Sequence, residues 1–297
     1  MAPTSILFYK DVGHSQEGAK EVVSLFEGKG NFDGPKPVRL LNRILTLANL
    51  GKESIILDFF AGSGSTAHAV MDLNKKDGGN RKYVCVQLPE LTDEKSEAYK
   101  AGYKTIAEIS KERIRRAGKK IQGEIDAEIK KIEAKINKLH GELPTDDTKA
   151  EIKNLQSKIT NLKSQDLGFK VLKLENSNFK QWQQIEGKDA KALAEQMKLF
   201  VDPVAESATI KNMVYELLLK SGKDLNSSIE RKDSSFKING NELVLLLEKA
   251  TQEIIDSIIA EKPNKVIALD KLFKGNDQLK TNTVLQMRDA GIEFKTI

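Results

Sequence analysis

The sequence has few of the residues that form covalent cross-links and metal sites. Its one cysteine, Cys85, excludes an internal disulfide and is typical of proteins from a reducing cytoplasm. The three histidines, His14, His68 and His140, lie far apart in the sequence and form no metal-binding motif with the cysteine. We therefore expect a cytoplasmic protein that binds no metal.

Long apolar runs are also missing. No segment reaches the roughly 20 apolar residues that are needed to cross a bilayer, and the N-terminus MAPTSILFYKDVGHSQEG does not resemble a signal peptide. The composition is 39% hydrophobic and 31% charged, which predicts a polar globular protein with no membrane partner. The net charge of +5 permits contact with nucleic acid but is too small to predict it alone.

Residues 54–90 contain the pattern of a βαβ unit. The apolar run SIILDFF predicts a buried strand, and STAHAVMDLNKK predicts a helix that Ser65 or a neighbour can cap. The segment RKYVCVQLPE predicts a second buried strand, parallel to the first. Two further helices are expected upstream, in AKEVVSLF and VRLLNRILTLANL.

The long polar stretch after Tyr99 predicts helices. Its apolar residues recur at spacings of four and three, the pattern of a coiled-coil seam. They are Ile121, Ile125, Ile129, Ile132, Ile136, Leu139 and Leu143, followed after Pro144 by Ile152, Leu155, Ile159 and Leu162. We expect residues 118–166 to form an antiparallel helical arm, which is either a spacer or a binding surface for a partner.

The remaining segments predict a return to the first domain and then a separate small domain. LGFKVLKLENSNFKQW alternates like a strand, and beyond residue 205 helices and strands follow one another. The helices are expected in IKNMVYELLLKSG and ATQEIIDSIIAEK, and the strands in ELVLLLE, KVIALD and GIEFKTI. We therefore expect a core made of 1–117 and 167–200, the arm at 118–166, and an α/β domain at 205–297.

The residues that suggest chemistry are concentrated in the turn DFFAGSGST, residues 58–66. Gly62 and Gly64 leave out side chains where the backbone bends sharply and can touch a ligand. The turn is not a phosphate loop, and it lacks the third glycine of the dinucleotide fingerprint. Taken alone it is equally typical of an ordinary tight turn. The polar end QLPE of the second strand favours a ligand, because such strand ends bind ribose hydroxyls.

Several segments of the sequence resemble conserved motifs of one protein family. LDFFAGSGSTAHAVMDLNKKDGGNRKYVCVQLPE resembles the S-adenosylmethionine-binding motif of amino-methyltransferases of the β arrangement, in particular the modification (Mod) subunits of type III restriction-modification systems. FDGPKPVRLL is similar to the motif on the N-terminal side of this one. The C-terminal stretches of these subunits are similar to three later segments, DEKSEAYKAGYKTIAEISKERIRRAG, LGFKVLKLENSNFKQW and LFKGNDQLKTNTVLQMRDAGIEFKTI.

The resemblance covers nearly the whole chain except the arm, and it implies an α/β fold. The expected architecture is a partial Rossmann-like methyltransferase sheet with a helical coiled-coil hairpin insertion and a small C-terminal α/β domain. The implied cofactor is S-adenosyl-L-methionine. The residues expected to bind it are Phe32, Lys36, Pro37, Asp58, Phe59, Phe60, Ala61, Gly62, Ser63, Gly64, Ser65, Thr66, Gln87 and Glu90.

Two of these positions are alternatives for one role. Many relatives have a glutamate that binds the ribose, where this sequence has Gln87, which can hydrogen-bond a hydroxyl without a charge. Glu90 is the other candidate. Phe32, Lys36 and Pro37 are expected near the methionine end of the cofactor. His68 is interpreted as a packing or capping residue rather than a base.

A catalytic residue is not found in this sequence. Methyl transfer to an exocyclic amine requires a flipped base and acceptors for the amine hydrogens, which the resembled family provides with an Asp/Asn-Pro-Pro-Tyr/Phe tetrapeptide. None of the seven prolines are adjacent, and only 57 residues precede Asp58, where the family has its catalytic and target-recognition regions. We expect the cofactor-binding and C-terminal part of a DNA adenine-N6 methyltransferase, inactive alone.

The expected partners are DNA, bound through the complete enzyme, an N-terminal catalytic half or a second Mod copy, and the restriction (Res) subunit. An alternative function is a non-catalytic assembly module that binds Mod or restriction subunits. A third is a methyltransferase for RNA or small molecules. The loop FKGNDQLKTN, with Lys274, Asn276, Asp277 and Lys280, is either a solvated turn or a segment that orders the C-terminal domain against a partner.

Overall fold

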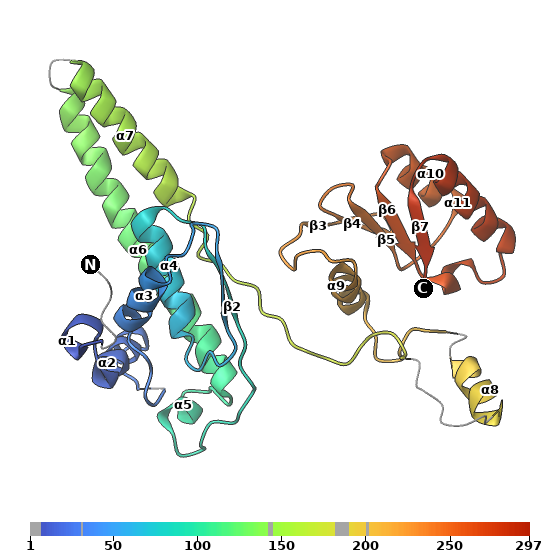
Figure 1. Cartoon of the computed structure of the whole chain (residues 1–297), viewed down its shortest axis with the longest axis horizontal. Coiled ribbons are helices and arrows are strands. Elements are labelled where there is room, and N and C mark those ends of the chain that lie inside the picture. Colours follow the sequence, from blue (N-terminus) through green and yellow to red (C-terminus); the bar gives the residue numbers. More distant parts are fainter. Residues whose placement is uncertain (1–6, 31, 142–144, 182–189, 200–201) are drawn as a thin grey trace. The chain divides into compact units, whose positions relative to one another are not determined.

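The computed structural model describes residues 7–30, 32–141, 145–181, 190–199 and 202–297. The chain forms two compact units that divide between Leu172 and Lys173. Each unit has its own sheet and helices (Figure 1). The division differs from the predicted boundaries, which assigned 167–200 to the first domain. Among the described residues, no helix is both long and apolar enough to span a bilayer.

The first unit is built around one βαβ motif. Strand β1 (Ile55–Asp58) runs parallel to β2 (Lys82–Cys85), and α4 (Ser65–Asp77) connects them. The order of strand, turn, helix and strand predicted for this region is confirmed. These two strands are the whole sheet of this unit within the described residues, so a larger Rossmann-like sheet remains a prediction.

Helices pack against α4 from two sides. The apolar residues of α3 (Val38–Leu47) contact one side of α4, and those of α6 (Ile106–His140) contact the other. Both predicted upstream helices are present, in α2 (Ser15–Leu25) and α3. The short helices α1 (Tyr9–Val12) and α5 (Glu97–Lys100) complete this part of the unit.

The two strands are buried on one face only, which corrects the prediction that both are buried strands. Ile56 and Tyr83 pack against the helices, but Ile55 is 63% exposed and Leu57 is 60% exposed. The apolar run predicted a strand that is buried on both faces, because the strands of parallel sheets usually are. The exposed apolar residues of this face and its continuation are Ile55, Leu57, Phe59, Phe60, Val84, Val86, Leu88 and Leu91.

Helix α4 begins at a glycine rather than at a side-chain cap. Its N-cap is Gly64, which has φ +77° and makes no side-chain cap hydrogen bond. Of the predicted alternatives, Ser65 or a neighbour, the neighbour Gly64 occupies the N-cap position, and the Ser65 hydroxyl accepts a hydrogen bond from Arg113 of α6. A Cβ at Gly64 would lie 3.0 Å from Ile114 of α6, so both the backbone angle and the packing favour glycine here.

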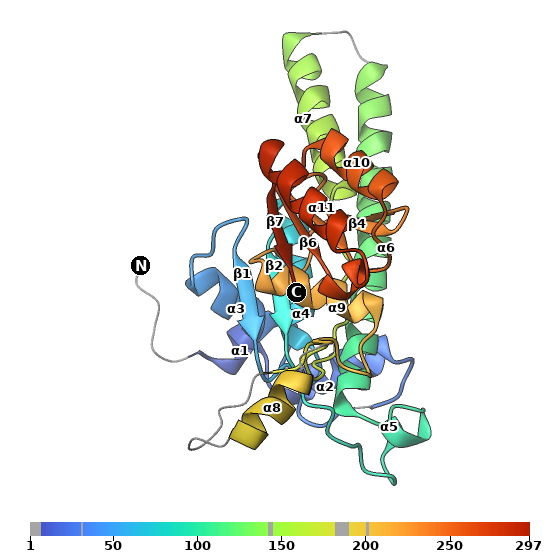
Figure 2. The same cartoon turned by 90° about the vertical axis from the view of Figure 1, so that its right-hand side faces the viewer.

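Helix α6 continues into the predicted arm, where it lies beside α7 (Asp146–Lys163) (Figures 1 and 2). The ion pairs Lys135–Glu151 and Lys158–Glu128, each 2.6 Å, have an antiparallel order. One apolar cluster joins the helices, with Ile121, Ile125, Ile129, Ile132, Ile136 and Leu162 buried and Ile152, Leu155 and Ile159 packed against them. Coiled-coil geometry remains a prediction, and Leu143 and Pro144 lie outside the described residues.

The segment after the arm is not a strand, contrary to the prediction for LGFKVLKLENSNFKQW. The described residues 165–181 contain no helix or strand, and one isolated bridge joins Phe179 to Val204. Leu174 is 98% exposed. The alternation matches a strand, but a strand also requires a neighbouring edge to pair with. Trp182, at the end of this segment, lies outside the described residues.

The second unit is an α/β domain with a five-stranded sheet in the order β3-β4-β5-β6-β7. The first three strands are antiparallel, and β5, β6 and β7 are parallel. The strands are β3 (Ile229–Lys232), β4 (Ser235–Ile238), β5 (Leu243–Leu246), β6 (Lys265–Ala268) and β7 (Glu293–Thr296). The three strands and two helices that the sequence predicts here are confirmed, whereas the β3–β4 hairpin was not predicted.

Helices cover both faces of this sheet. Helix α9 (Ile210–Lys220) packs on one face, and α10 (Gln252–Glu261) and α11 (Asp277–Asp289) pack on the other. Alternate residues of β5 join the two clusters: Leu243 and Leu245 face α9, while Val244 and Leu246 face α10 and α11. Helix α8 (Ala190–Leu199) precedes α9 in the chain.

The predicted loop FKGNDQLKTN is mostly the start of a helix, which corrects that prediction. Asn276 caps α11, because its side chain accepts a hydrogen bond from the Leu279 N–H at 3.0 Å. Lys280 lies in the helix and forms an ion pair with Asp270 at 2.5 Å. Asp270 begins the 3-10 helix η1 (Asp270–Phe273). The signal for a helix was the cap itself, an asparagine directly before a helix-forming run.

Candidate functional site

The glycine turn lies beyond the carboxyl end of β1, which is where ligands bind in parallel α/β sheets. Backbone hydrogen bonds tie it to the end of β2. The Ala61 N–H donates to Val86 O at 3.1 Å, and the Val86 N–H donates to Asp58 O at 2.8 Å. Gly62 and Gly64 have φ of +52° and +77°, in the left-handed region that favours glycine.

The two glycines have different neighbours. A Cβ at Gly62 would lie 3.3 Å from Cζ of Phe32, so the Phe32 ring lies beside the turn. A Cβ at Gly64 would instead meet Ile114 and the Ser110 carbonyl of α6. Gly62 therefore borders the aromatic side of the turn, whereas Gly64 permits close packing of the turn on α6.

Gln87 lies against the turn. Its Oε1 accepts a hydrogen bond from the Gly62 N–H at 2.8 Å, and its Nε2 donates to Leu88 O at 3.2 Å. Glu90 is exposed, and its backbone carbonyl accepts a hydrogen bond from the Ile106 N–H at 2.9 Å. Of the two alternatives for the ribose, Gln87 is the one whose side chain contacts the turn. Both roles remain predictions.

Asp58 and Thr66 connect the two ends of the turn. One carboxylate oxygen of Asp58 accepts a hydrogen bond from the Phe60 N–H at 3.2 Å. The other accepts from the Thr66 hydroxyl at 2.5 Å. Since the carboxylate is committed to these bonds, we expect both residues to act on a ligand mainly by shaping the turn.

Two aromatic side chains project from this end of the sheet. Phe59 and Phe60 are 62% and 80% exposed, and their ring centroids lie 5.1 Å apart. Of the upstream motif, Pro37 is buried at the start of α3, and Lys36 is exposed. Exposed aromatic faces beside a polar turn suit a ligand that contains a flat ring and charged groups.

Three residues outside the predicted set support the turn from α2 and α6. The Ser110 hydroxyl donates to the Gly62 carbonyl. The fully buried Arg113 donates from Nη1 to the Ser63 hydroxyl at 2.6 Å and to the Ser65 hydroxyl. The carboxylate of Glu21 lies 3.5 Å from Arg113 Nη2.

The sequence of α6 contains a pattern that could have identified Arg113 as a buried residue with polar partners. Ile109, Ala117 and Ile121 recur at helical spacing and are buried, and Arg113 occupies the same stripe. A charged residue in an apolar stripe requires a buried partner. The sequence therefore contained a sign that α6 contacts something polar, although it did not identify the two serines.

Burial sets the charge of the groups near the turn. It lowers the pKa of Arg113 to about 10, while the Glu21 carboxylate acts in the opposite direction, so the guanidinium remains charged at neutral pH. Burial raises the pKa of Glu21, opposed by the Val38 N–H and by Arg113. Burial, together with Arg113 and Lys120, lowers the pKa of His68 to about 4, so its ring is neutral at pH 7.

Among the described residues, the other nucleophilic and titratable side chains of this region do not form a reactive centre. Burial raises the pKa of the Cys85 thiol to about 12, so it stays protonated. His68 is 7% exposed, which fits the interpretation as a packing residue. Among the residues that the structure describes, no group of histidine, cysteine, aspartate and glutamate side chains could hold a metal ion.

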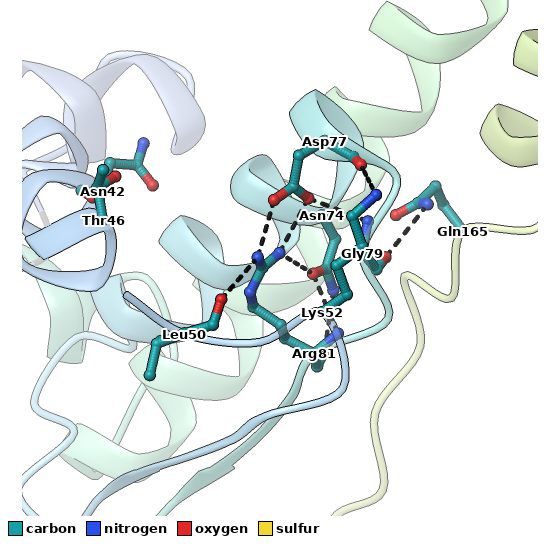
Figure 3. Close-up of polar contacts among 9 residues, drawn as sticks. All are labelled: Asn42, Thr46, Leu50, Lys52, Asn74, Asp77, Gly79, Arg81 and Gln165. Carbon is teal, nitrogen blue, oxygen red and sulfur yellow. Dashed lines mark hydrogen bonds and ion pairs between the residues drawn. The ribbon is translucent and has the colours of Figure 1, made fainter. Parts of the chain in front are cut away.

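A second buried arginine holds the opposite end of α4 (Figure 3). Arg81, just before β2, donates to both carboxylate oxygens of Asp77, at 2.9 and 2.8 Å. Asn74 exchanges hydrogen bonds with the Arg81 backbone, at 2.9 and 3.1 Å. Gln165, just after α7, donates to the Gly79 carbonyl at 3.5 Å. This network stabilises the amino end of β2, whereas the glycine turn lies beyond the carboxyl end of β1.

Comparison with known proteins identifies the region that contains the turn. Residues 7–135 match the family of DNA methylases named N6_N4_Mtase. Three relatives are type III restriction-modification enzyme Mod subunits. StyLTI Mod of Salmonella typhimurium is 48% identical over 115 residues, EcoPI Mod of Escherichia phage P1 is 42% identical over 118, and EcoP15I Mod of Escherichia coli is 47% identical over 89.

These alignments cover 39%, 40% and 30% of this chain, but only 17%, 18% and 14% of the respective relatives. The chain thus spans less than a fifth of the length of each of these three relatives. The matched region includes β1, the glycine turn, α4, β2 and the part of α6 that contacts the turn. Residues 7–135 are thus similar to the DNA methylase family and to part of the Mod subunits of type III restriction-modification enzymes.

Proposed function

We propose that the glycine turn binds S-adenosyl-L-methionine, and that the chain is the cofactor-binding part of a type III DNA adenine-N6 methyltransferase. The observation that carries this proposal is the turn itself. Gly62 and Gly64 bend the chain beyond a parallel strand, Gln87 lies against the bend, and the region matches DNA methylases.

The residues around the turn fit the chemistry of this cofactor. The exposed aromatic rings of Phe59 and Phe60 suit its adenine, and the exposed cation of Lys36 suits its carboxylate. Gln87 can bind a ribose hydroxyl through its remaining hydrogen-bonding capacity. When bound, the cofactor supplies the methyl group from its sulfonium. The chain's own residues bind and orient it.

We also propose that a complementary catalytic half supplies the Asp/Asn-Pro-Pro-Tyr/Phe motif and the contacts that read DNA. The uncovered face of β1 and β2 supports this partner. Ile55, Leu57 and Val84 form an exposed apolar strip on parallel strands, which are normally covered on both faces. A second Mod copy is the alternative occupant, and the restriction subunit is a further proposed partner.

A non-catalytic assembly module is the second candidate function. The observation that favours it is the second unit, a self-contained α/β domain with helices on both faces of its sheet. In this proposal the second unit and the arm bind Mod or restriction subunits, and any cofactor has a structural role. The two functions differ in whether a methyl group reaches DNA.

Titration calorimetry of the chain with S-adenosylmethionine tests the cofactor proposal. We expect weak to moderate saturable binding, competition by S-adenosylhomocysteine, and a lower affinity for Gln87→Leu. The matched control is Arg81→Lys, a change in the same unit at the opposite end of α4. Absence of binding by the unaltered chain would contradict the proposal.

Methyl transfer separates the two candidate functions. Labelled cofactor and mixed-sequence DNA should give no incorporation with this chain alone, because the sequence has no pair of adjacent prolines. Incorporation should begin when a polypeptide that carries the Asp/Asn-Pro-Pro-Tyr/Phe motif is added. If the added polypeptide forms a stable complex with this chain but no methyl group is incorporated, the result would favour the assembly module. Turnover by this chain alone would contradict the need for a complementary half.

A further inference from the structure

One buried side chain connects parts of the proposed cofactor site that are distant in the sequence. Arg113 of α6 is fully buried and donates from Nη1 to the hydroxyls of Ser63 and Ser65. These serines flank Gly64, and their oxygens lie 3.1 Å apart. The guanidinium therefore holds three consecutive residues of the turn from the side that faces the protein.

The other side of the guanidinium faces Glu21 of α2. Nη2 of Arg113 lies 3.5 Å from the Glu21 carboxylate. Both oxygens of that carboxylate accept hydrogen bonds from the Val38 N–H, at 3.2 and 3.1 Å. Val38 comes directly after Pro37, the end of the motif that contains Lys36. Glu21 thus holds the upstream motif while it pairs with the arginine that holds the turn.

We propose that Arg113 and Glu21 are positioning residues that fix the glycine turn relative to the Lys36–Pro37 segment, so that the cofactor meets a preformed site. This inference rests on the proposed function for the identity of the ligand. It goes beyond that function because neither residue is among those predicted to bind the cofactor, and both act through residues that are or that lie next to them. A preformed loop binds more tightly because its ordering is complete before the ligand arrives.

The geometry of arginine is needed for this role. Its planar fork reaches the two serine hydroxyls with one nitrogen and the Glu21 carboxylate with the other. A lysine ammonium is a single point, and it can serve the serines or the glutamate but not both. Arg113→Lys therefore keeps the buried charge and removes the link between the two segments.

The experiment compares Arg113→Lys with Arg81→Lys in the full chain. Arg81 is the matched control because it is also buried and ion-paired, but at the opposite end of α4 (Figure 3). Three measurements are made on each variant: S-adenosylmethionine affinity by calorimetry, amide hydrogen exchange of Gly62 and Gly64 without ligand, and urea unfolding. Arg113→Lys should weaken binding about tenfold, equivalent to about 1.4 kcal/mol, and should accelerate exchange at both glycines.

The control should lose stability without either change at the turn. Equal affinity and equal glycine exchange in Arg113→Lys and the unaltered chain would overturn the inference. If the unaltered chain does not bind the cofactor, the proposed function fails, and glycine exchange alone decides whether Arg113 positions the turn.

A second variant covers the case in which Arg113→Lys does not fold. Ser63→Ala combined with Ser65→Ala leaves the arginine and Glu21 in place and removes the acceptors on the turn. We expect the same loss of affinity and the same faster exchange at Gly62 and Gly64. A double alanine variant that binds the cofactor and protects these amides like the unaltered chain would overturn the inference.

Discussion

Strands β1 and β5 look alike in the sequence but are buried differently. IILD and LVLL are short apolar runs, each with a turn and a helix after it. All residues of β5 are buried, whereas Ile55 and Leu57 of β1 are mostly exposed. The neighbours explain the difference. β5 pairs with a strand on each side and has helices on both faces. Within the part of the chain that the structure describes, β1 pairs with β2 alone and has helices on one face.

An apolar run therefore predicts a strand that can be buried on both faces, but it does not identify the element or partner that buries each face. In the second unit, α9, α10 and α11 supply the cover within the same unit. In the first unit the outer face of β1 stays exposed within the described residues. We propose that the complementary catalytic half covers it, and matched substitutions in the two sheets can test this difference.

The largest effect should come from a charge placed in the second sheet. Leu245→Asp puts a carboxylate in the cluster under α9 and should destabilise the second unit by more than about 3 kcal/mol. The matched change Leu57→Asp lies on the exposed face and should alter stability by less than about 0.5 kcal/mol. Urea unfolding and hydrogen exchange of each strand provide the measurements. A large loss in Leu57→Asp would mean that the face is covered in the isolated chain.

Acid should weaken the second unit through Glu216 of α9. Burial alone would raise the pKa of Glu216, but hydrogen bonds from Lys220, Ser177 and Asn178 lower it from an ordinary 4.5 to about 2. Because the folded pKa is below the unfolded one, this stabilisation is present above pH 4.5 and is lost as the pH falls toward 2. We expect a loss of about 1–2 kcal/mol after allowance for solvent screening.

Hydrogen exchange of the second unit between about pH 5 and pH 2.5 measures this loss, after correction for intrinsic rates. Glu216→Gln should remove much of the pH dependence, and Glu230→Gln, on exposed β3, is the control. An unchanged acid transition in Glu216→Gln would assign the sensitivity to another carboxylate.

A smaller effect is expected where the turn meets β2. Gln87→Glu keeps the oxygen that accepts the Gly62 N–H and adds a charge for the ribose hydroxyls. We expect cofactor affinity to rise roughly fivefold, equivalent to about 1 kcal/mol. Calorimetry measures this, with Glu90→Gln as the matched change at the alternative position. If Glu90→Gln weakens binding and Gln87→Glu has no effect, the ribose contact belongs to Glu90.

The smallest effect should result from shortening the arm. Removing residues 127–158 and joining the ends with a short glycine linker deletes the outer part of α6 and α7 but keeps Ser110, Arg113 and Ile121. Cofactor affinity should change by less than about twofold, an energy change below about 0.5 kcal/mol. Circular dichroism checks the expected loss of helix. Loss of binding together with unfolding would mean that the arm is part of the core.

Sequence patterns were sufficient where neighbouring residues decide the structure. Gly62 and Gly64 marked the turn because their backbone angles require glycine, and the runs around them predicted β1, α4 and β2 correctly. The pattern failed in the segment after the arm, where a strand period was present without a strand to pair with. It also missed the β3–β4 hairpin, whose short strands contain several exposed polar residues.

The sequence by itself determined the order β1, α4, β2, the position of the glycine turn and the likeness to DNA methylases, because these depend on residues close together in the chain. Tertiary structure alone decided that Ser63 and Ser65 face Arg113, that Gln87 bonds the Gly62 N–H, and that the outer face of β1 is uncovered. The physical reason is burial. A guanidinium such as that of Arg113 selects polar partners only after folding removes it from water and brings residues about 50 and 90 positions away to its side.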